Sequence, residues 1–385
     1  MRRLRDELNQ RRELHLYRTR RLLQSPQGIE VRVDGESLLS FCSNDYLGLA
    51  NDARVLAAFK QGAERFGVGS GASHLVSGHG VAHHALEEEL AAFVGSRRAL
   101  LFSTGYMANL GAVSALLGRG DTAFEDKLNH ASLIDAARLS GAAVKRYRHL
   151  DVTRLETLMQ AAPGEKLVLT DGVFSMDGDV APLPSLMELT RTHDAWLLVD
   201  DAHGFGVLGE GGRGTFEYFQ QPLESSVILL GTLGKAFGTF GAFIAGDDDL
   251  IEHLIQSARS YIYTTALPPA VAEATRASLR IVQEEAWRRA ALRERIAQFR
   301  AGATQLGFRL LDSFTPIQPL MLGDAETAVQ VSEALRGRGI LVPAIRPPTV
   351  PSGSARLRIS FCASHSAQHV EQLLAALAVV TPNRA

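Results

Sequence analysis

The chain has 385 residues, of which 46% are hydrophobic and 21% are charged, and its formal net charge is −2 at pH 7. This length suits two or three globular domains with ample core, and the near-neutral charge gives no electrostatic reason to expect nucleic acid or an anionic membrane as a partner. The two cysteines, Cys42 and Cys362, lie far apart without metal-ligand spacing. We therefore expect a reducing, cytoplasmic setting with no disulfide framework and no metal site.

The N-terminus is basic, and Arg18 and Arg20 lie near its end. It lacks the apolar stretch of a secretory signal, and the acidic residues among its first 13 positions are atypical of a transit peptide. No apolar run approaches the roughly 18 residues that a membrane span requires. We expect a solvated first helix, followed by short strands at residues 29–33 and 38–41.

The middle of the chain, residues 46–280, alternates short apolar runs with helical patterns. Leu86, Leu90 and Phe93 share one face of a helix that we expect to end at Gly95. This alternation predicts an α/β domain with a mainly parallel central sheet and helices on both faces. The predicted strands are residues 99–102, 122–124, 167–169, 196–199, 227–230 and 241–245.

The last hundred residues change character and predict a smaller α+β domain. A long amphipathic helix over residues 292–306 is expected to end at Gly307. The segments that follow are strand-like at residues 308–311 and 317–322, helical near 326–335 and strand-like again at 356–360. We expect three regions: an N-terminal arm (1–45), a large domain (46–280) and a small C-terminal domain (281–385).

Polar residues follow five of the predicted strands. In an open parallel sheet, the ligand site lies outside the carboxyl ends of the strands. We therefore expect these residues to form one site. The segments concerned are residues 103–109, 125–130, 171–175, 200–203 and 232–235.

Lys235 is the main catalytic candidate, because it follows an apolar strand in the glycine turn Thr232-Leu233-Gly234-Lys235. A lysine alone in such a turn is more often a surface residue. The preceding predicted strand, however, runs into Asp200-Asp201-Ala202-His203. Pyridoxal 5'-phosphate (PLP) needs a lysine amine for its aldehyde and a carboxylate for its pyridine nitrogen. The two motifs together predict a PLP enzyme.

Asp200 is the candidate that keeps the pyridine nitrogen protonated. Asp201 competes for this role and is expected to face away if Asp200 holds it. The structural alternative for Asp200 is a helix N-cap. His203 is expected to hydrogen-bond the phenolic oxygen of the cofactor, although a histidine considered alone is more often a packed core residue.

A phosphate site is expected where Thr104-Gly105-Tyr106 opens a helix, because free amides and the helix dipole suit an anion. Thr232 is expected to add a hydroxyl. The glycine-rich run at residues 67–78 has neither a preceding strand in a βαβ unit nor a Gly-Lys-Ser ending. It therefore fits neither a dinucleotide nor a P-loop site, and we expect a mobile loop over the active site.

Two further residues are candidates for binding. His130 offers a flat aromatic face that suits stacking on the cofactor ring, and a packed histidine is the alternative. Arg346 lies in a stiff proline-rich loop, residues 344–351. A rigidly presented guanidinium suits two-point binding of a carboxylate, and a structural salt bridge is the alternative.

Taken together, these residues resemble the α-oxoamine synthase family of fold-type-I PLP-dependent enzymes. The similarity covers essentially the whole chain, and the lysine and aspartate motifs are specific to that family. The loop Ile-Arg-Pro-Pro-Thr-Val-Pro favours its biotin-pathway member. The segments that carry the resemblance are residues 41–49, 171–179, 200–204, 232–235 and 345–351.

The resemblance implies an acyltransferase that condenses L-alanine with a pimeloyl thioester and releases carbon dioxide. It assigns Lys235 to the bond with the cofactor, and it places His130 among the catalytic residues with Asp200 and His203. The residues implied to contact PLP are Gly105, Tyr106, His130, Ser175, Asp200, His203, Thr232, Lys235 and Thr264.

The same resemblance implies how the substrates bind. Arg346 grips the amino-acid carboxylate, and Arg18, or the nearby Arg20, contacts the acyl substrate. The family forms homodimers with shared active sites, so two residues of one subunit are expected to reach the partner's site. The residues implied to contact substrate are Arg18, His130, Tyr263, Arg346 and Thr349, with Tyr263 and Thr264 reaching across.

Several alternatives stay open at this stage. Glycine acetyltransferase, aminolevulinate synthase and sphingoid-base synthases share the catalytic set and differ in pocket size. An aminotransferase of the same fold is a rival of another reaction class. A non-catalytic, lysine-less subunit is disfavoured because Lys235, Asp200 and His203 are all present. The acyl carrier, coenzyme A or acyl carrier protein, is not fixed by the sequence.

Overall fold

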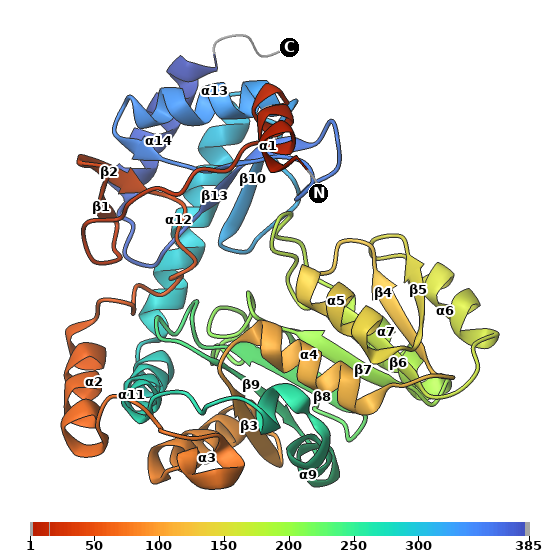
Figure 1. Ribbon diagram of the computed structural model, residues 1–385. Helices are drawn as coiled ribbons and strands as arrows, with labels where there is room; N and C mark the ends of the chain where they lie inside the picture. The colour runs from red at the N-terminus through yellow and green to blue at the C-terminus, as the bar shows by residue number, and fades with distance from the viewer. Residues whose placement is uncertain (1–2, 15, 382–385) are drawn as a thin grey trace. The chain divides into compact units, whose positions relative to one another are not determined.

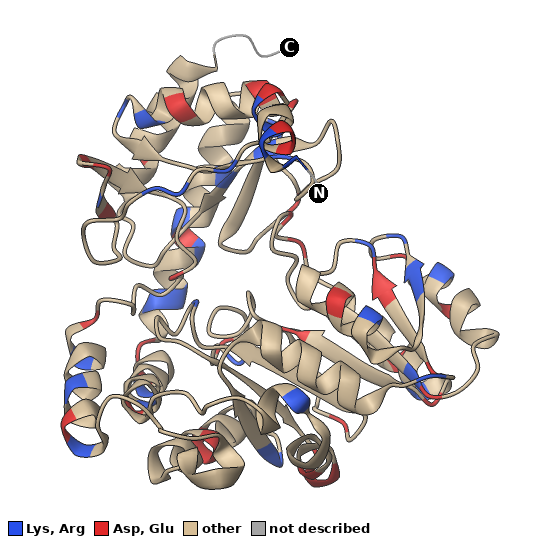
Figure 2. Cartoon of the chain, viewed as in Figure 1, with Lys and Arg blue, Asp and Glu red and all other residues tan. Residues whose placement is uncertain are grey.

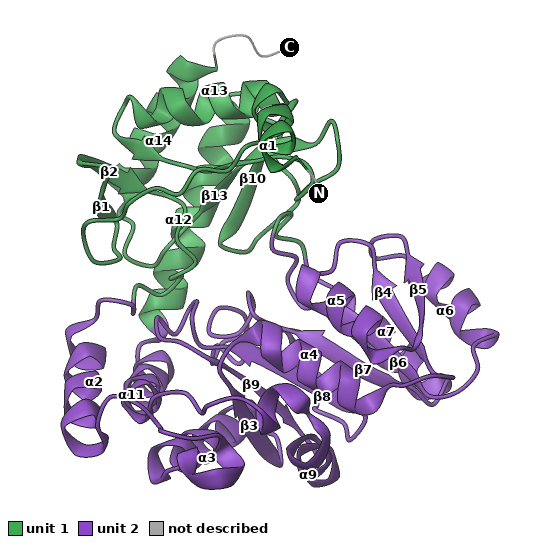
Figure 3. Ribbon diagram, viewed as in Figure 1, with its two compact units in different colours: residues 1–48, 176–179, 287–385 green, residues 49–175, 180–286 purple. Residues whose placement is uncertain are grey.

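The computed structural model describes residues 3–14 and 16–381. The chain divides into two compact units, which Figure 3 distinguishes by colour. Unit 1 comprises residues 1–48, 176–179 and 287–385, and unit 2 comprises residues 49–175 and 180–286. The three regions expected from the sequence, with boundaries near residues 45 and 280, stay a prediction.

Unit 2 is built on a seven-stranded sheet. Strands β4 to β8 run parallel to one another, and β9 runs antiparallel to both of its neighbours, β3 and β8. The predicted mainly parallel α/β sheet is confirmed, with one reversed strand. The spatial order is β3 (Arg98–Phe102), β9 (Ala242–Gly246), β8 (Val227–Thr232), β7 (Trp196–Asp200), β6 (Lys166–Asp171), β4 (Thr122–Asp126) and β5 (Ala143–Tyr147).

Helices cover both faces of this sheet (Figure 1). Strands β6, β7 and β8 are consequently apolar along most of their length, and Leu197, Leu198 and Val199 of β7 are fully buried. Apart from Lys166 at the start of β6, their polar residues lie toward the carboxyl ends. The helices are α2 (Ala53–Phe66), the π-helix η1 (His74–Gly78), α3 (Val81–Val94), α4 (Gly105–Leu116), α5 (Ala131–Ser140), α6 (Val152–Gln160), α7 (Leu183–Thr192), α8 (Thr215–Tyr218), α9 (Asp248–Ser257), α10 (Arg259–Ile262) and α11 (Pro269–Glu284).

Unit 1 contains two small three-stranded sheets. In the first, β1 (Glu30–Val33) pairs with β2 (Glu36–Ser40), which also pairs with β11 (Ile340–Leu341). In the second, β13 (Ala355–Ser360) lies between β10 (Ile317–Gly323) and β12 (Ala344–Ile345). The helices of this unit are α1 (Leu4–Glu13), α12 (Ala286–Gln305), α13 (Ala325–Arg336) and α14 (Ala367–Val380). Within the described residues, no helix combines the length and the hydropathy needed to cross a membrane.

The structure differs from the sequence-based elements at one predicted strand. The segment Phe308–Leu311 forms no strand and makes only an isolated bridge, between Leu310 and Leu320. Gly307 ends α12 in a left-handed conformation, with φ of 77°. Directly after the bridge the chain enters a polar turn, so it cannot continue alongside β10.

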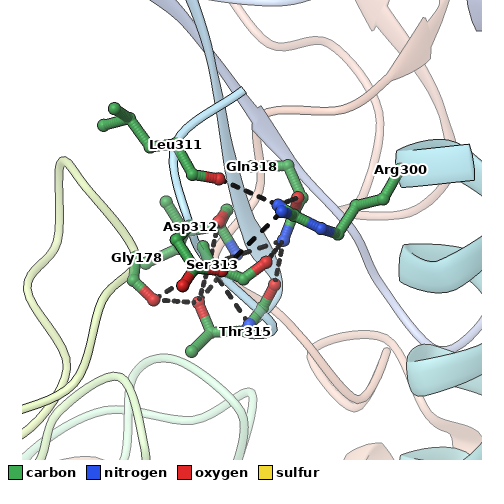
Figure 4. Close-up of polar contacts among 8 residues, drawn as sticks. Gly178, Arg300, Leu311, Asp312, Ser313, Thr315 and Gln318 are labelled. Atoms are coloured by element: carbon green, nitrogen blue, oxygen red, sulfur yellow. Dashed lines mark hydrogen bonds and ion pairs between the residues drawn. The ribbon is translucent and has the colours of Figure 1, made fainter. Parts of the chain in front are cut away.

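Side-chain hydrogen bonds hold that turn (Figure 4), and the side chains of Ser313, Thr315 and Gln318 are buried. Gln318, which has no exposed surface, donates from Nε2 to the carbonyls of Ser313 and Thr315, both at 2.8 Å. Its Oε1 accepts from Arg300 Nη1 at 2.9 Å. The hydroxyls of Ser313 and Thr315 donate to the Gly178 carbonyl at 2.9 and 3.0 Å. One buried amide therefore satisfies two carbonyls and one guanidinium.

Replacing this amide is expected to destabilise the protein. Gln318→Leu removes the donor to the two buried carbonyls and one of the acceptors of Arg300, at a cost of about 2–4 kcal/mol. Gln330→Leu, at an exposed position of α13, is the matched control and should cost less than about 0.5 kcal/mol. Midpoints of urea unfolding compare the variants with the parent. Equal midpoints for the two variants would contradict the assigned role of Gln318.

Candidate active site

Lys235 and His203 meet at the carboxyl ends of β8 and β7. Lys235 follows β8 by three residues, and its Nζ lies 2.9 Å from Nε2 of His203. His203 is buried and follows β7 by three residues. The two strands pair in parallel, so both turns leave the sheet at the same edge. The structure thus brings together the lysine and the histidine of the two sequence motifs.

Asp200 ends β7 and is the centre of a hydrogen-bonded chain. Its Oδ2 accepts from Asn109 Nδ2 at 2.7 Å, and its Oδ1 accepts from the Ala202 amide at 3.1 Å. Asn109 Nδ2 also lies 2.8 Å from Ser132 Oγ, which in turn lies 2.7 Å from His130 Nδ1. This series of hydrogen bonds connects the Asp200 carboxylate with α4 and with the start of α5.

Asn109 lies within the predicted segment 103–109 but has no predicted role, and Ser132 lies outside the predicted segments, although both belong to this set of contacts. Asn109 is four residues after Gly105, so it lies on the same face of α4 one turn further on. That spacing is the one signal in the sequence for Asn109. Burying an asparagine in an apolar helix is costly unless its side chain has a hydrogen-bond partner. The identity of the partner, Asp200, depends on sheet topology.

A second buried carboxylate, Asp171, adds to the electrostatics of the site. It ends β6 directly beside Asp200, and its Oδ2 accepts from the His130 amide at 2.7 Å. Burial raises the pKa of Asp171, and the neighbouring charge of Asp200 raises it further, while Lys235 opposes the rise. The charges of Lys235, Asp200 and Asp171 therefore act on one another.

Asp201 takes no part in this series of hydrogen bonds, as expected if Asp200 is the functional carboxylate. Its Oδ2 accepts from the Thr215 amide at 2.7 Å, and its Oδ1 has no partner among the described residues. A Cβ on Gly172, Gly204 or Gly214 would overlap its carboxylate oxygens. Burial raises the pKa of Asp201 to about 8.

This raised pKa predicts a pH dependence of stability. The unfolded chain releases the Asp201 proton near its ordinary pKa of 3.8, whereas the folded chain keeps it up to about pH 8. The bound proton therefore adds to the free energy of unfolding. This contribution is complete below about pH 4 and is lost as the pH rises to 8.

Asp201→Asn removes this titration, so its urea midpoint should fall less between pH 5 and pH 8 than that of the parent. Other buried carboxylates are common to both chains, and the difference between the two profiles isolates Asp201. Parallel profiles would show that Asp201 is ionised in the folded protein.

A candidate phosphate cradle lies where β3 leads into α4. Thr104 caps α4, and its Oγ1 accepts from the Met107 amide at 3.1 Å. A Cβ on Gly105 would come within 2.8 Å of Thr232 Cγ2, so a larger residue at this position would collide with the Thr232 side chain. The first amides of a helix have no acceptor within it. The backbone amides of Gly105 and Tyr106 are therefore available to an anion. The Tyr106 side chain lies elsewhere, where its hydroxyl donates to Asp135.

Three other predicted residues of unit 2 lie in turns. Ser175 is half-buried in the turn after β6. Tyr263 follows α10 with 71% of its surface exposed, and Thr264 beside it is half-buried. Their expected roles toward cofactor and partner subunit remain predictions.

Unit 1 brings the predicted substrate residues Arg18, Arg346 and Thr349 together around a cavity of about 800 Å³. Arg18 donates from Nη2 to Thr349 Oγ1 at 3.2 Å, although 331 positions separate them. Arg20 also lines this cavity, in the arginine-rich segment after α1 (Figure 2). Of the two candidates, Arg18 is the one in contact with Thr349.

The positive charge of this cavity favours an anionic ligand. Partial burial lowers the pKa of Arg346, and the nearby charge of Arg18 lowers it further. Arg346 also donates from Nη2 to the Tyr17 carbonyl at 3.4 Å. Two guanidiniums that disfavour each other's charge are stabilised when a carboxylate or phosphate binds between them.

The residues of unit 2 fit PLP. The cofactor needs an amine, a carboxylate for its ring nitrogen and a site for its phosphate. Lys235 supplies the amine, Asp200 supplies a carboxylate that Asn109 fixes in place, and the first amides of α4 offer donors for the phosphate. Each group lies at the carboxyl end of a strand of the same sheet.

Comparisons with known proteins agree with this chemistry. Residues 36–377 match the family model described as aminotransferase class I and II. An 8-amino-7-oxononanoate synthase from Nitrosococcus oceani is 62% identical over 375 residues, which are 97% of this chain and 100% of the relative. One from Thioalkalivibrio sulfidiphilus is 61% identical over 381 residues, covering 98% of this chain and 97% of the relative.

Solved structures show the same fold. A serine palmitoyltransferase from Sphingomonas wittichii has a TM-score of 0.93 and 34% identity, over 98% of this chain and 97% of that one. A serine palmitoyltransferase from S. paucimobilis, solved with PLP and myriocin bound, has a TM-score of 0.92, 32% identity, and coverage of 98% and 96%. An 8-amino-7-oxononanoate synthase from Francisella tularensis has a TM-score of 0.79, 32% identity, and coverage of 90% and 98%.

Proposed function

The chain belongs to the 8-amino-7-oxononanoate synthase family, and we propose that it condenses L-alanine with a pimeloyl thioester in biotin biosynthesis. The reaction forms a bond between the α-carbon of alanine and the acyl carbon of the thioester. The carbon–sulfur bond breaks and releases the thiol, and the alanine carboxyl leaves as carbon dioxide. The product is 8-amino-7-oxononanoate.

The observation that carries this proposal is the convergence of Lys235, His203 and Asp200 at the carboxyl ends of β7 and β8. PLP, when bound, supplies an aldehyde that bonds an amine and a ring that withdraws electrons from the bonded amino acid. Lys235 would bond this aldehyde, and Asp200 would keep the ring nitrogen protonated. Gly105, Tyr106 and Thr232 would hold the phosphate, while His130 would stack on the ring and Ser175 would contact it.

Lys235 is also the group placed to move the α-proton of alanine. An amine acts as a base only in its neutral form, because only that form has a lone pair to take up the proton. Nε2 of His203, 2.9 Å from Nζ, accepts or donates a hydrogen bond according to its tautomer. His203 can thus orient the lysine as well as contact the phenolic oxygen of the cofactor.

The substrate roles follow the family motifs. Arg346 binds the alanine carboxylate, Thr349 lines the substrate site, and Arg18 contacts the acyl substrate. Holding the carboxylate at two points would select which bond of the α-carbon reacts first. We further propose a cytoplasmic homodimer, in which the exposed Tyr263 and its neighbour Thr264 reach the partner's site. The relatives at 61–62% identity favour this reaction over that of another α-oxoamine synthase, such as glycine acetyltransferase.

The role of Lys235 can be tested by substitution. Lys235→Ala should lower turnover by about 10³-fold or more and remove the visible absorbance band of the bound cofactor, with the fold intact by circular dichroism. Lys60→Ala, at an exposed position of α2, is the matched control and should keep parental turnover. Near-normal turnover of Lys235→Ala would refute the central assignment.

The substrate assignment can be tested by competition. The protein with PLP is given alanine, glycine and serine together with acetyl-, succinyl-, pimeloyl- and palmitoyl-coenzyme A, and the products are identified by mass. We expect 8-amino-7-oxononanoate. A different aminoketone would move the enzyme within the α-oxoamine synthases. A parallel reaction with pimeloyl acyl carrier protein shows which carrier is used, and no condensation with either carrier would favour an aminotransferase.

A further inference from the structure

Unit 2 carries a cluster of histidines that the proposed reaction does not use. The π-helix η1 and the turn after it contribute His74 and His79, and the first two turns of α3 contribute His83 and His84. A cavity of about 290 Å³ borders His74, His79 and His84 together with Glu87. Nitrogen and carboxylate ligands around one cavity are the donor set that zinc and related divalent metals prefer.

Three of these side chains have the geometry of a metal site. One ligand atom each from His79, His84 and Glu87 lies within 4.8 Å of the other two. His79 Nε2 is 3.8 Å from Glu87 Oε2. Ligands at about 2.1 Å from a tetrahedral zinc ion lie about 3.4 Å apart, so small side-chain rotations bring the three groups to bonding distance.

We propose that His79, His84 and Glu87 bind a divalent metal ion of the zinc class at a site separate from the PLP chemistry. A set of two imidazoles and one carboxylate leaves a fourth position for water. His79 directly follows η1, and the other two ligands lie one turn apart on α3. The ion would therefore fasten the end of η1 to the start of α3.

Contacts behind the ligands orient them toward the common point. His79 Nδ1 lies 3.0 Å from His74 Nδ1. When His79 donates in this hydrogen bond, its Nε2 carries the lone pair that a metal requires. His74 itself is 7% exposed and stacks on Tyr261, with ring centroids 4.8 Å apart. Such a buried support fixes the plane of the His79 ring.

Glu87 is oriented in the same way. Its Oε1 accepts from the Leu101 amide at 2.9 Å, which leaves Oε2 on the side of His79. The Glu87 side chain is 12% exposed, whereas that of His84 is 66% exposed. The site thus has one deep ligand, one intermediate ligand and one at the surface through which an ion can enter.

The surrounding charges are compatible with a cation. Arg97 and Arg98 also border the cavity, but each is paired with a carboxylate of α9. Arg97 Nη2 lies 3.0 Å from Asp248, and Arg98 Nη1 lies 3.3 Å from Glu252. Glu88, whose Oε1 is 3.4 Å from His84 Nε2, adds a second negative charge at the entrance.

The site is tested by titrating PLP-loaded, untagged protein, freed of metal with a chelator, with zinc chloride in an isothermal calorimeter. We expect one zinc ion per chain in the parent. His84→Ala and Glu87→Gln should bind at least tenfold more weakly, and Glu87→Gln keeps an acceptor for the Leu101 amide. His253→Ala, which removes an exposed histidine of α9, is the matched control and should bind like the parent.

Two results would overturn the proposal. The first is a parent that takes up no zinc, and the second is equal affinity in the parent, His84→Ala and Glu87→Gln. His84 is largely exposed, so its replacement leaves the fold intact even if Glu87→Gln fails to fold. A melting temperature that rises with zinc in the parent and in His253→Ala, but not in His84→Ala, would support the fastening of η1 to α3.

Discussion

The hydrogen bond between Asn109 and Asp200 is the interaction on which the site of unit 2 depends. A carboxylate held away from water at the end of β7 is costly unless donors compensate it. The Asn109 amide and the Ala202 backbone supply these donors. Because Asn109 also contacts Ser132, which contacts His130, this requirement fixes α4 and the start of α5 against the same carboxylate.

Sheet burial explains why much of this site could be predicted from the sequence. A strand covered on both faces is mostly apolar, so the polar residues at its carboxyl end mark the edge of the sheet. That rule leads to Asp200, the last residue of β7, and to the turn after β8 that contains Lys235. It fails at β5, an edge strand with the sequence Ala-Val-Lys-Arg-Tyr, where exposure permits charged residues and the apolar pattern is lost.

The remaining parts could not be predicted because their partners are distant in the chain. Nothing local to Arg18 indicates that it meets Thr349, and only the family resemblance associated them. Likewise, the expectation that the chain holds no metal rests on its two cysteines, whereas the ligands inferred here are histidines and a glutamate. The sequence does not show that these three side chains lie close together, because their proximity depends on how the chain folds between η1 and α3.

The three glycines that pack against the Asp201 carboxylate limit how the sequence can change. Gly172, Gly204 and Gly214 come from three separate loops, yet each excludes a side chain because of the same carboxylate. None of the three can gain a Cβ while Asp201 is present, and Gly214 is further restricted by its φ of 95°. In a library of variants, these four positions should therefore behave as one epistatic group: a small residue at 201 would first have to appear before alanine becomes acceptable at 172 or 204.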